Sequence, residues 1–269
     1  MADCLRIASW NINSIRPRLH CVEQFVADCR PDVLCLQEIK VVDELFPAEE
    51  LKAMGFVHQA VYGQKGYNGV AILGTERAPL DKITRRDWCE IEHARHLHCL
   101  LPGGIELHNF YVPAGGDVPD VTLNDKFEHK LRFMTDVAAW FKARKKKTNR
   151  FMLLGDLNVA PLETNVWNHK QLLKVVSHTP IEVEHMQAWY DSHDWIDAVR
   201  HFVPPEEKIY SWWSYRAKDW SAADKGRRLD HIWVTPALAP ALKSAAIHRP
   251  ARGYEKASDH APAIVEVTL

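Results

Sequence analysis

Apolar and polar residues alternate along this chain with two distinct periods. Runs that alternate at every second residue, or that are apolar throughout, predict strands over residues 5–10, 32–37, 70–73, 105–111, 151–154, 229–234 and 263–267. Apolar positions three or four residues apart predict helices over residues 18–29, 48–54 and 127–144. No change of composition marks a boundary and no repeat is present, so we expect residues 1–269 to form one domain.

The composition is that of an ordinary globular protein. Of the 269 residues, 46% are hydrophobic and 26% are charged, which excludes a disordered or fibrous chain. The formal net charge of -1 argues mildly against a general nucleic-acid binder. Clustered carboxylates at a metal site would, however, offset a local basic surface, so the total charge does not exclude DNA.

Cysteine usage and hydropathy limit the class of protein further. The six cysteines form no C-x-x-C pair, which excludes a zinc ribbon or a disulfide scaffold, and Cys35 lies in an apolar run typical of a reduced core residue. No segment approaches transmembrane length, and the N-terminus has no basic region followed by an apolar stretch. We therefore expect a soluble, cytoplasmic protein with no membrane partner.

Polar side chains recur at the ends of the predicted strands. They are Asn11, Glu38, Tyr111, Asp156, Asn158, Asp230, Asp259 and His260. Each alone is weak evidence, because Asp and Asn favour loops in any protein and the chain has 15 histidines. If these ends meet at one rim of a sheet, the carboxylates would suit a hard cation and the amides and histidine would suit a phosphate.

Seven short motifs in a fixed order resemble those of a known family. They are WNINSIR (10–16), LQEIK (36–40), GYNGVA (66–71), YVP (111–113), GDLN (155–158), RLD (228–230) and SDHAP (258–262). The family is the exonuclease III type of apurinic/apyrimidinic endonuclease, within the wider endonuclease/exonuclease/phosphatase superfamily. Because the motifs extend from Trp10 to Pro262, the resemblance covers almost the whole chain.

The resemblance implies an α/β fold, a four-layered α/β sandwich of two mixed β-sheets flanked by helices. It also implies a metal-dependent phosphodiesterase of base-excision repair that acts on double-stranded DNA with abasic sites or blocked 3′ ends. The implied reactions are incision 5′ to abasic sites, 3′→5′ exonuclease action and 3′-end trimming, in an order that the sequence leaves open. A monomer is the default for this family.

The implied cofactor is Mg²⁺, with Mn²⁺ as an alternative because both ions accept oxygen ligands. Glu38 resembles the main metal ligand of the family. Asn11 and Asp259 resemble its helpers, either directly or through water.

Five residues resemble the family's catalytic groups. Asp156 would position or deprotonate the attacking water, and Asn158 would hold that water and the phosphate. Tyr111 would donate to a phosphate oxygen. Asp230 would orient His260, which would bind the phosphate and favour the pentacoordinate state. Which group acts as the base stays open.

The resemblance also implies a pocket for a flipped-out abasic sugar, which a compact apolar wall accepts while it rejects a full nucleotide. Its wall positions are Trp212, Arg227 and Leu229. Three further positions resemble contacts to the DNA backbone: Arg16, Lys40 and Tyr67.

The chain departs from the family pattern at several positions. Ala114 stands where Asn or Gln is frequent, Asn13 where some relatives have Asp, and Ile39 where Thr is common. Arg227 replaces a large apolar wall residue, which puts the strictness of abasic-site selection in doubt. Residues 164–186 match no motif of the family.

Other readings of the sequence remain open. The same superfamily includes phosphatases of non-nucleic phosphate esters, such as phosphoinositides, and sphingomyelinases; the Trp212 loop and residues 11–16 favour DNA over them. A 3′-phosphatase specialist with weak abasic incision is a further alternative. A binding protein that had lost catalysis would be expected to lack one of Glu38, Asp156, Asp230 and His260, and all four are present.

Overall fold

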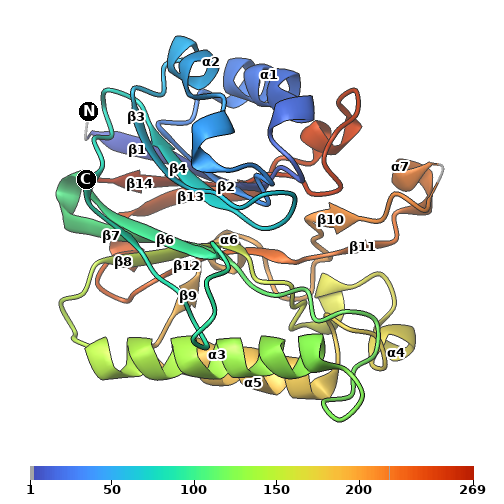
Figure 1. The fold of residues 1–269 in the computed structure, drawn as a ribbon. Helices are drawn as coiled ribbons and strands as arrows, with labels where there is room; N and C mark the ends of the chain where they lie inside the picture. Colours follow the sequence, from blue (N-terminus) through green and yellow to red (C-terminus); the bar gives the residue numbers. More distant parts are fainter. Residues whose placement is uncertain (1–2, 218) are drawn as a thin grey trace.

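Two six-stranded β-sheets pack face to face in the computed structural model, and helices cover the outer side of each sheet (Figure 1). The structure describes residues 3–217 and 219–269. The layers stack as helix, sheet, sheet and helix, which is the α/β sandwich that the sequence predicted.

The first sheet has the strand order β13-β14-β1-β2-β4-β3. These strands are β1 (Cys4–Asn11), β2 (Val33–Gln37), β3 (His58–Tyr62), β4 (Val70–Gly74), β13 (Leu242–Ile247) and β14 (Ala263–Thr268). The second sheet has the order β5-β6-β7-β8-β12-β9. Its strands are β5 (Asp81–Arg85), β6 (His96–Leu101), β7 (Ile105–Tyr111), β8 (Phe151–Asp156), β9 (Ile196–Asp197) and β12 (Asp230–Val234).

Both sheets are mixed. β1 runs parallel to β2 in the first sheet and β7 runs parallel to β8 in the second, whereas β12 runs antiparallel to β8. Parallel neighbours end at the same edge of a sheet, so the carboxyl ends of β1 and β2, and those of β7 and β8, lie side by side. This topology places the polar residues that follow these four strands in two adjacent pairs.

The outer layers consist of α1 (Leu19–Cys29) and α2 (Ala48–Ala53) over the first sheet and α3 (Asp125–Arg144) and α5 (Pro180–Asp191) over the second (Figure 1). Shorter helices are α4 (His169–Leu172), α6 (Ala198–Phe202) and α7 (Trp220–Ala223). The 3-10 helices are η1 (Arg16–Arg18), η2 (Asp43–Leu45), η3 (Pro102–Gly104), η4 (Glu163–Asn165), η5 (Ala239–Ala241) and η6 (Arg249–Gly253). None of the helices in these described ranges is long and apolar enough to cross a bilayer.

The burial of β2 on both faces explains its apolar run. Val33 and Cys35 point into the core between the sheets, and Leu34 and Leu36 pack against the helical layer that contains Phe25 of α1. Side chains alternate between the faces of a strand, so a strand covered on both sides is apolar throughout. Cys35 is a free, buried thiol, as predicted.

A two-stranded arm lies beside the sandwich. β10 (Trp212–Trp213) pairs with β11 (Gly226–Arg227), and the chain between them carries α7 away from the sheets (Figure 1). Isolated bridges join Trp212 to His260 and Arg227 to Val166. The arm is therefore attached to the sandwich at three residues of the predicted site, Trp212, Arg227 and His260, and at Val166, which matched no motif.

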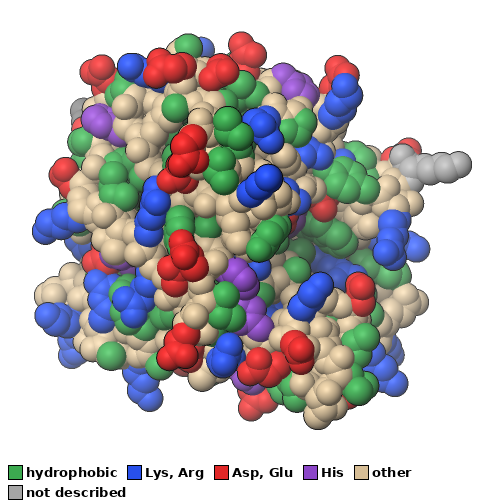
Figure 2. Space-filling model, viewed as in Figure 1, with side chains coloured by type: hydrophobic (Ala, Val, Ile, Leu, Met, Phe, Trp, Pro, Cys, Tyr) green, Lys and Arg blue, Asp and Glu red, His purple; other side chains and the backbone are tan. Residues whose placement is uncertain are grey.

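Charged side chains of both signs are mixed over the face shown in Figure 2, in keeping with the net charge of -1. The surface is hollowed between the main body and the arm, and Lys and Arg side chains flank this hollow (Figure 2).

Seven strands were absent from the sequence prediction: β3, β5, β6, β9, β10, β11 and β13. Every residue of β5 is exposed, so this edge strand has no buried face to produce a pattern. Residues 164–186, which matched no motif, contain parts of η4 and α5 and the whole of α4. The start of α5 did carry a signal, because Thr179 and Glu182 form a capping box around Pro180.

Candidate active site

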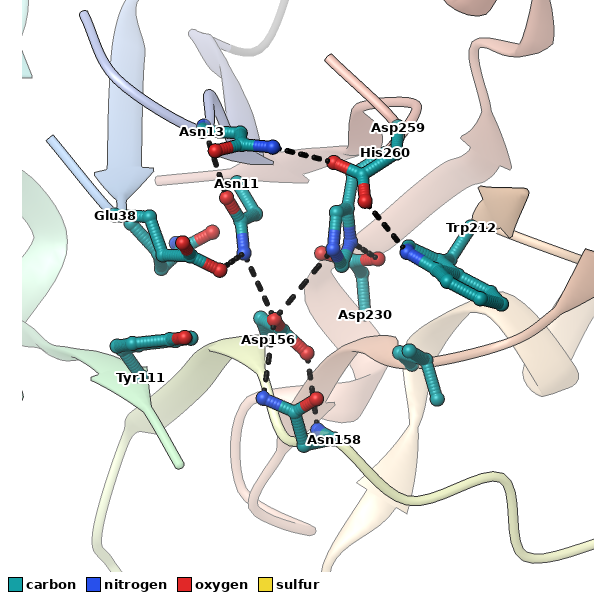
Figure 3. A network of polar contacts seen from close by, with 12 residues as sticks. Asn11, Asn13, Glu38, Tyr111, Asp156, Asn158, Trp212, Asp230, Asp259 and His260 are labelled. Atoms are coloured by element: carbon teal, nitrogen blue, oxygen red, sulfur yellow. Dashed lines mark hydrogen bonds and ion pairs between the residues drawn. The ribbon is translucent and has the colours of Figure 1, made fainter. Parts of the chain in front are cut away.

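Polar ends of strands from both sheets meet at one rim of the sandwich (Figure 3). Asn11 ends β1, Tyr111 ends β7 and Asp156 ends β8, while Glu38 directly follows β2. Asp230 begins β12 and lies opposite Asp156 in the antiparallel register. The structure thus brings these strand ends together, as the sequence led us to expect.

Asp156 is the hub of the hydrogen-bond network in Figure 3. Asn11 Nδ2 donates to its Oδ2 at 2.9 Å, and Asn158 donates to Oδ1 from its backbone N at 3.0 Å and to Oδ2 from Nδ2 at 3.2 Å. Burial raises the pKa of Asp156 to about 7; the charge of His260 opposes this rise and that of Asp230 adds to it. A carboxyl group with this pKa exchanges protons with water near neutral pH.

His260 and Asp230 form a buried pair. His260 Nδ1 donates to Asp230 Oδ2 at 2.8 Å, and His260 Nε2 lies 3.7 Å from Asp156 Oδ2. Burial by itself lowers the pKa of His260, but the carboxylates of Asp230 and Asp156 reverse this effect and raise it to about 10. His260 is therefore an imidazolium at neutral pH, with its charge next to Asp156.

Glu38 stands on the opposite side of Asn11 from His260. Asn11 Nδ2 donates to Glu38 Oε1 at 2.8 Å, and Lys40 Nζ lies 2.7 Å from Oε2. Burial acts to raise the pKa of Glu38, but the charge of Lys40 and the hydrogen bonds outweigh it and leave the pKa below its usual value. The carboxylate is therefore ionised.

Asp259 is tied to both sides of the rim. Asn13 Nδ2 donates to its Oδ1 at 3.0 Å and Trp212 Nε1 donates to its Oδ2 at 2.9 Å. Lys40 Nζ donates in turn to Asn13 Oδ1 at 2.6 Å. Asn13, a departure from the family pattern, thus links Lys40 to Asp259.

Four residues of the network stand on unusual backbone, and Lys40, with a φ of 53°, is one of them. Asn13, Glu38 and Asn158 have φ angles of 47°, 50° and 54°, in the left-handed region that side chains other than Gly seldom adopt. Their conformation turns the chain sharply after a strand, which directs the side chains into the rim.

The donor set of the rim fits a hard divalent cation. Glu38, Asp156 and Asp259 offer carboxylate oxygens, and Asp156, Asp230 and His260 offer ligand atoms within 4.8 Å of one another. Asn11 Oδ1 accepts a hydrogen bond from the backbone N of Asn13 at 3.0 Å, while its Nδ2 donates to both carboxylates. Asn11 thus turns its amide nitrogen, and not its oxygen, toward Glu38 and Asp156.

Tyr111 is backed by a cation that the sequence prediction missed. Arg95 Nη1 donates to the carbonyl of Tyr111 at 3.2 Å, and its guanidinium carbon lies 4.8 Å from the centre of the Tyr111 ring. Burial, together with the charge of Glu38, raises the pKa of Tyr111 well above its usual value, so its hydroxyl keeps its proton and remains a donor. No motif marked Arg95, since it precedes β6, a strand without a predicted pattern.

A cavity of about 850 Å³ opens from the rim toward the arm. Its catalytic end is lined by Glu38, Tyr111, Asp156, Asn158, Asp259 and His260. Its other end is lined by aromatic and basic residues: Trp167, Trp212, Trp213, Trp220, Arg216, Lys225 and Arg227. Leu229 lies buried in the wall between them, packed in a cluster with Trp212.

The three expected backbone contacts occupy different surroundings. Arg16 is exposed, and Tyr67 has 54% of its surface exposed and packs edge-on against His93. Lys40 instead belongs to the network, as the partner of Glu38. Arg16, Lys40 and Tyr67 are absent from the cavity lining among the described residues.

Behind Asn158 lies a buried ion pair that sequence reasoning also missed. Lys130 of α3 and Glu182 of α5 are both fully buried and form an ion pair. Lys130 Nζ donates to the carbonyl of Asn158 at 2.8 Å and to that of Ala114 at 3.3 Å. A lysine in an amphipathic helix is usually exposed, so only the capping box at Glu182 offered any sign of this support.

Comparison with known proteins agrees with this geometry. Residues 8–260 match the sequence profile of the Endonuclease/Exonuclease/phosphatase family. Exodeoxyribonuclease III of Haemophilus influenzae is 33% identical over 270 residues, which cover 96% of this chain and 98% of that protein.

Two solved structures are similar over nearly their whole length. An AP endonuclease from Archaeoglobus fulgidus has a TM-score of 0.89 and 29% identity, and the match covers 97% of this chain and 98% of that one. A 3′ phosphatase from Neisseria bound to a product DNA hairpin has a TM-score of 0.89 and 30% identity, and the match covers 98% and 100% of the two chains. The chain therefore belongs to the endonuclease/exonuclease/phosphatase family.

Proposed function

We propose that this chain is a metal-dependent hydrolase of damaged double-stranded DNA that breaks the bond between phosphorus and a 3′ oxygen. The same cut would incise the backbone 5′ to an abasic site, remove a 3′ phosphate or release a 3′ nucleotide. One observation carries the proposal: the buried line Asp156–His260–Asp230 opens on a cavity walled by tryptophan. The names of the relatives support the substrate class.

Each side chain of the catalytic end has a part in this reaction. Asp156, with a pKa near 7, would take the proton of the attacking water, and Asn158 would hold that water. The His260 imidazolium and the Tyr111 hydroxyl would donate to oxygens of the phosphate as negative charge develops on them. Asp230 would keep His260 charged and in place.

Glu38 would hold the metal, with Asp259 contributing directly or through water and Asn11 acting by fixing the carboxylates. We propose Mg²⁺, or Mn²⁺, because the donors are oxygens. When bound, the cation would neutralise phosphate charge and stabilise the leaving 3′ oxygen.

We further propose that residues 1–269 act as one domain, as a monomer in the cytoplasm. Residues Arg16, Lys40 and Tyr67 would contact the DNA backbone, and Trp212 and Leu229 would face the lesion.

The test is cleavage of a labelled duplex that carries one tetrahydrofuran abasic analogue, beside a duplex with a 3′ phosphate and an intact duplex. Each is incubated with Mg²⁺, with Mn²⁺ and with EDTA. We expect nicking 5′ to the analogue and release of phosphate with either metal, and neither product with EDTA. Hydrolysis of a phosphoinositide, with no action on any duplex, would instead identify a phosphatase of non-nucleic esters.

A 3′-phosphatase specialist is the second candidate. The observation that favours it is the guanidinium of Arg227, which stands over the ring of Trp212 at 5.2 Å inside the expected sugar pocket.

A further inference from the structure

We propose that Arg227 is a specificity residue that binds the terminal oxygens of a 3′ phosphate, so that the chain removes 3′ phosphates more readily than it incises abasic sites. The inference rests on the proposed function and names the preferred substrate of that site.

Arg227 is held in place as a fixed cation at the wall of the cavity. Its Nη1 donates to the carbonyl of Val176 at 3.0 Å and to Ser177 Oγ at 2.8 Å. Its guanidinium carbon lies 5.2 Å from the centre of the Trp212 ring. Both hydrogen-bond acceptors come from residues 164–186, so this segment, which matched no motif, sets the position of the cation.

The charge of Arg227 has no carboxylate partner among residues 3–217 and 219–269. Glu182 stabilises this charge at a distance, and the buried Lys130 opposes it. The oxygens of Glu182 are already used, by Lys130, by the backbone N of Ser177 at 2.8 Å and by Thr179 Oγ1 at 2.7 Å. A half-buried cation with no carboxylate partner is stabilised by an anion, and the cavity that Arg227 lines is where an anion would enter.

The position of Arg227 relative to the catalytic groups supports an anion from the substrate. Trp212 lies beneath Arg227, donates to Asp259 and bridges to the backbone of His260. A phosphate bound by His260 would therefore have Trp212 and Arg227 on its arm side. Arg216 and Lys225 line the same end of the cavity and add positive charge.

The two substrates differ at this side of the phosphorus. In both, water adds to phosphorus, the bond to the 3′ oxygen breaks and that oxygen leaves with a proton as a 3′ hydroxyl. Beyond the phosphorus, an abasic site carries a neutral sugar through an ester oxygen, whereas a 3′ phosphate carries a free, charged oxygen. A guanidinium favours the charged oxygen, and it occupies space that the sugar would need.

The experiment compares kcat/KM for a 3′-phosphate duplex with kcat/KM for the tetrahydrofuran duplex in wild type and variants. Arg227→Met removes the charge at similar length, and Arg227→Lys keeps it. Ser177→Ala removes one contact of Arg227 without changing the charge. Arg132→Met is the control, because it removes a cation that is exposed on α3 and absent from the cavity lining. Circular dichroism and melting curves establish that each variant is folded.

We expect Arg227→Met to lower kcat/KM on the 3′-phosphate duplex roughly 10- to 100-fold, mainly through KM, as for the loss of one charge-assisted contact. For the same variant, kcat/KM on the tetrahydrofuran duplex should stay the same or increase. Arg227→Lys should recover part of the lost 3′-phosphatase activity. Equal losses on both substrates, or an unchanged 3′-phosphatase activity, would overturn the inference. Inactivity of the wild type on every duplex would instead overturn the proposed function itself.

Discussion

The catalytic end of the cavity and the end formed by β10 and β11 differ in how their side chains are held. Asp156, Asp230 and His260 are almost fully buried and bonded to one another, and strands of both sheets carry the network. Trp212 and Arg227 are half-buried and sit on a two-stranded arm. The contrast suggests that the fold fixes the chemistry, while the arm sets which substrate reaches it.

The largest effect should come from breaking the catalytic end. We expect Asp156→Asn and His260→Ala each to lower cleavage of both damaged duplexes by about 1,000-fold or more, because each removes a group that we propose acts in the transition state. The measurement is single-turnover cleavage with Mg²⁺, with circular dichroism to show a native fold. Near wild-type cleavage by either folded variant would contradict the assignment.

Loss of the buried Lys130–Glu182 ion pair behind Asn158 should destabilise the protein. Lys130→Met leaves Glu182 as an unpaired buried carboxylate and removes a donor from the carbonyl of Asn158. We expect the free energy of unfolding to fall by about 3–5 kcal/mol, as measured by urea denaturation.

The matched control for that loss is Glu128→Gln, on the same helix. Glu128 forms an exposed pair with Arg132, and such pairs contribute little to stability. A loss for Lys130→Met no greater than that for Glu128→Gln would show that the buried pair does not support the fold.

The pH dependence of cleavage should reflect the pKa values of Asp156 and His260. The rate should rise as pH increases through about 7, where Asp156 loses its proton, and fall above about 10, where His260 loses its own. Asp230→Asn removes a carboxylate that raises the pKa of His260, so the falling limb should move toward neutral pH by about one unit or more. If the falling limb stays at the pH seen for the wild type, Asp230 does not raise the pKa of His260.

The arm should affect selectivity more than rate. We expect Trp212→Ala to lower incision at the abasic analogue about tenfold more than exonuclease action on an intact duplex, since we propose that its ring forms the wall that faces the lesion. The ratio of the two rates is the measurement, and Phe202→Ala, outside the cavity lining, is the control. An unchanged ratio would show that Trp212 does not determine which substrate is cut.

The sequence predicted most of the strands that are buried on both faces, although it missed the interior strand β6. Strands covered on both faces, such as β2 and β8, are apolar throughout and stand out in the chain, and their polar ends marked the rim. β5 and β13 lie at edges of the sheets and are largely exposed, so neither carries a periodic pattern.

The site shows the same limit. Residues placed by local motifs, such as Asp156 and His260, meet as expected. Arg95 and Lys130 act through contacts with residues that are distant in the sequence, and nothing local distinguishes them from surface cations. The contact between Arg227 and Ser177 joins β11 to a turn 50 positions earlier, so sequence spacing could not reveal it.

The left-handed backbone at Asn13, Glu38 and Asn158 has a consequence for how this protein could change. Such backbone costs on the order of 1–2 kcal/mol for an ordinary side chain, and somewhat less for Asn. Glycine relieves that strain but deletes the side chain that the rim requires. Selection for thermal stability alone would therefore favour glycine at position 38 and lead to an inactive protein with the same fold. Selection for DNA repair instead retains Glu38 and the strained backbone beneath it.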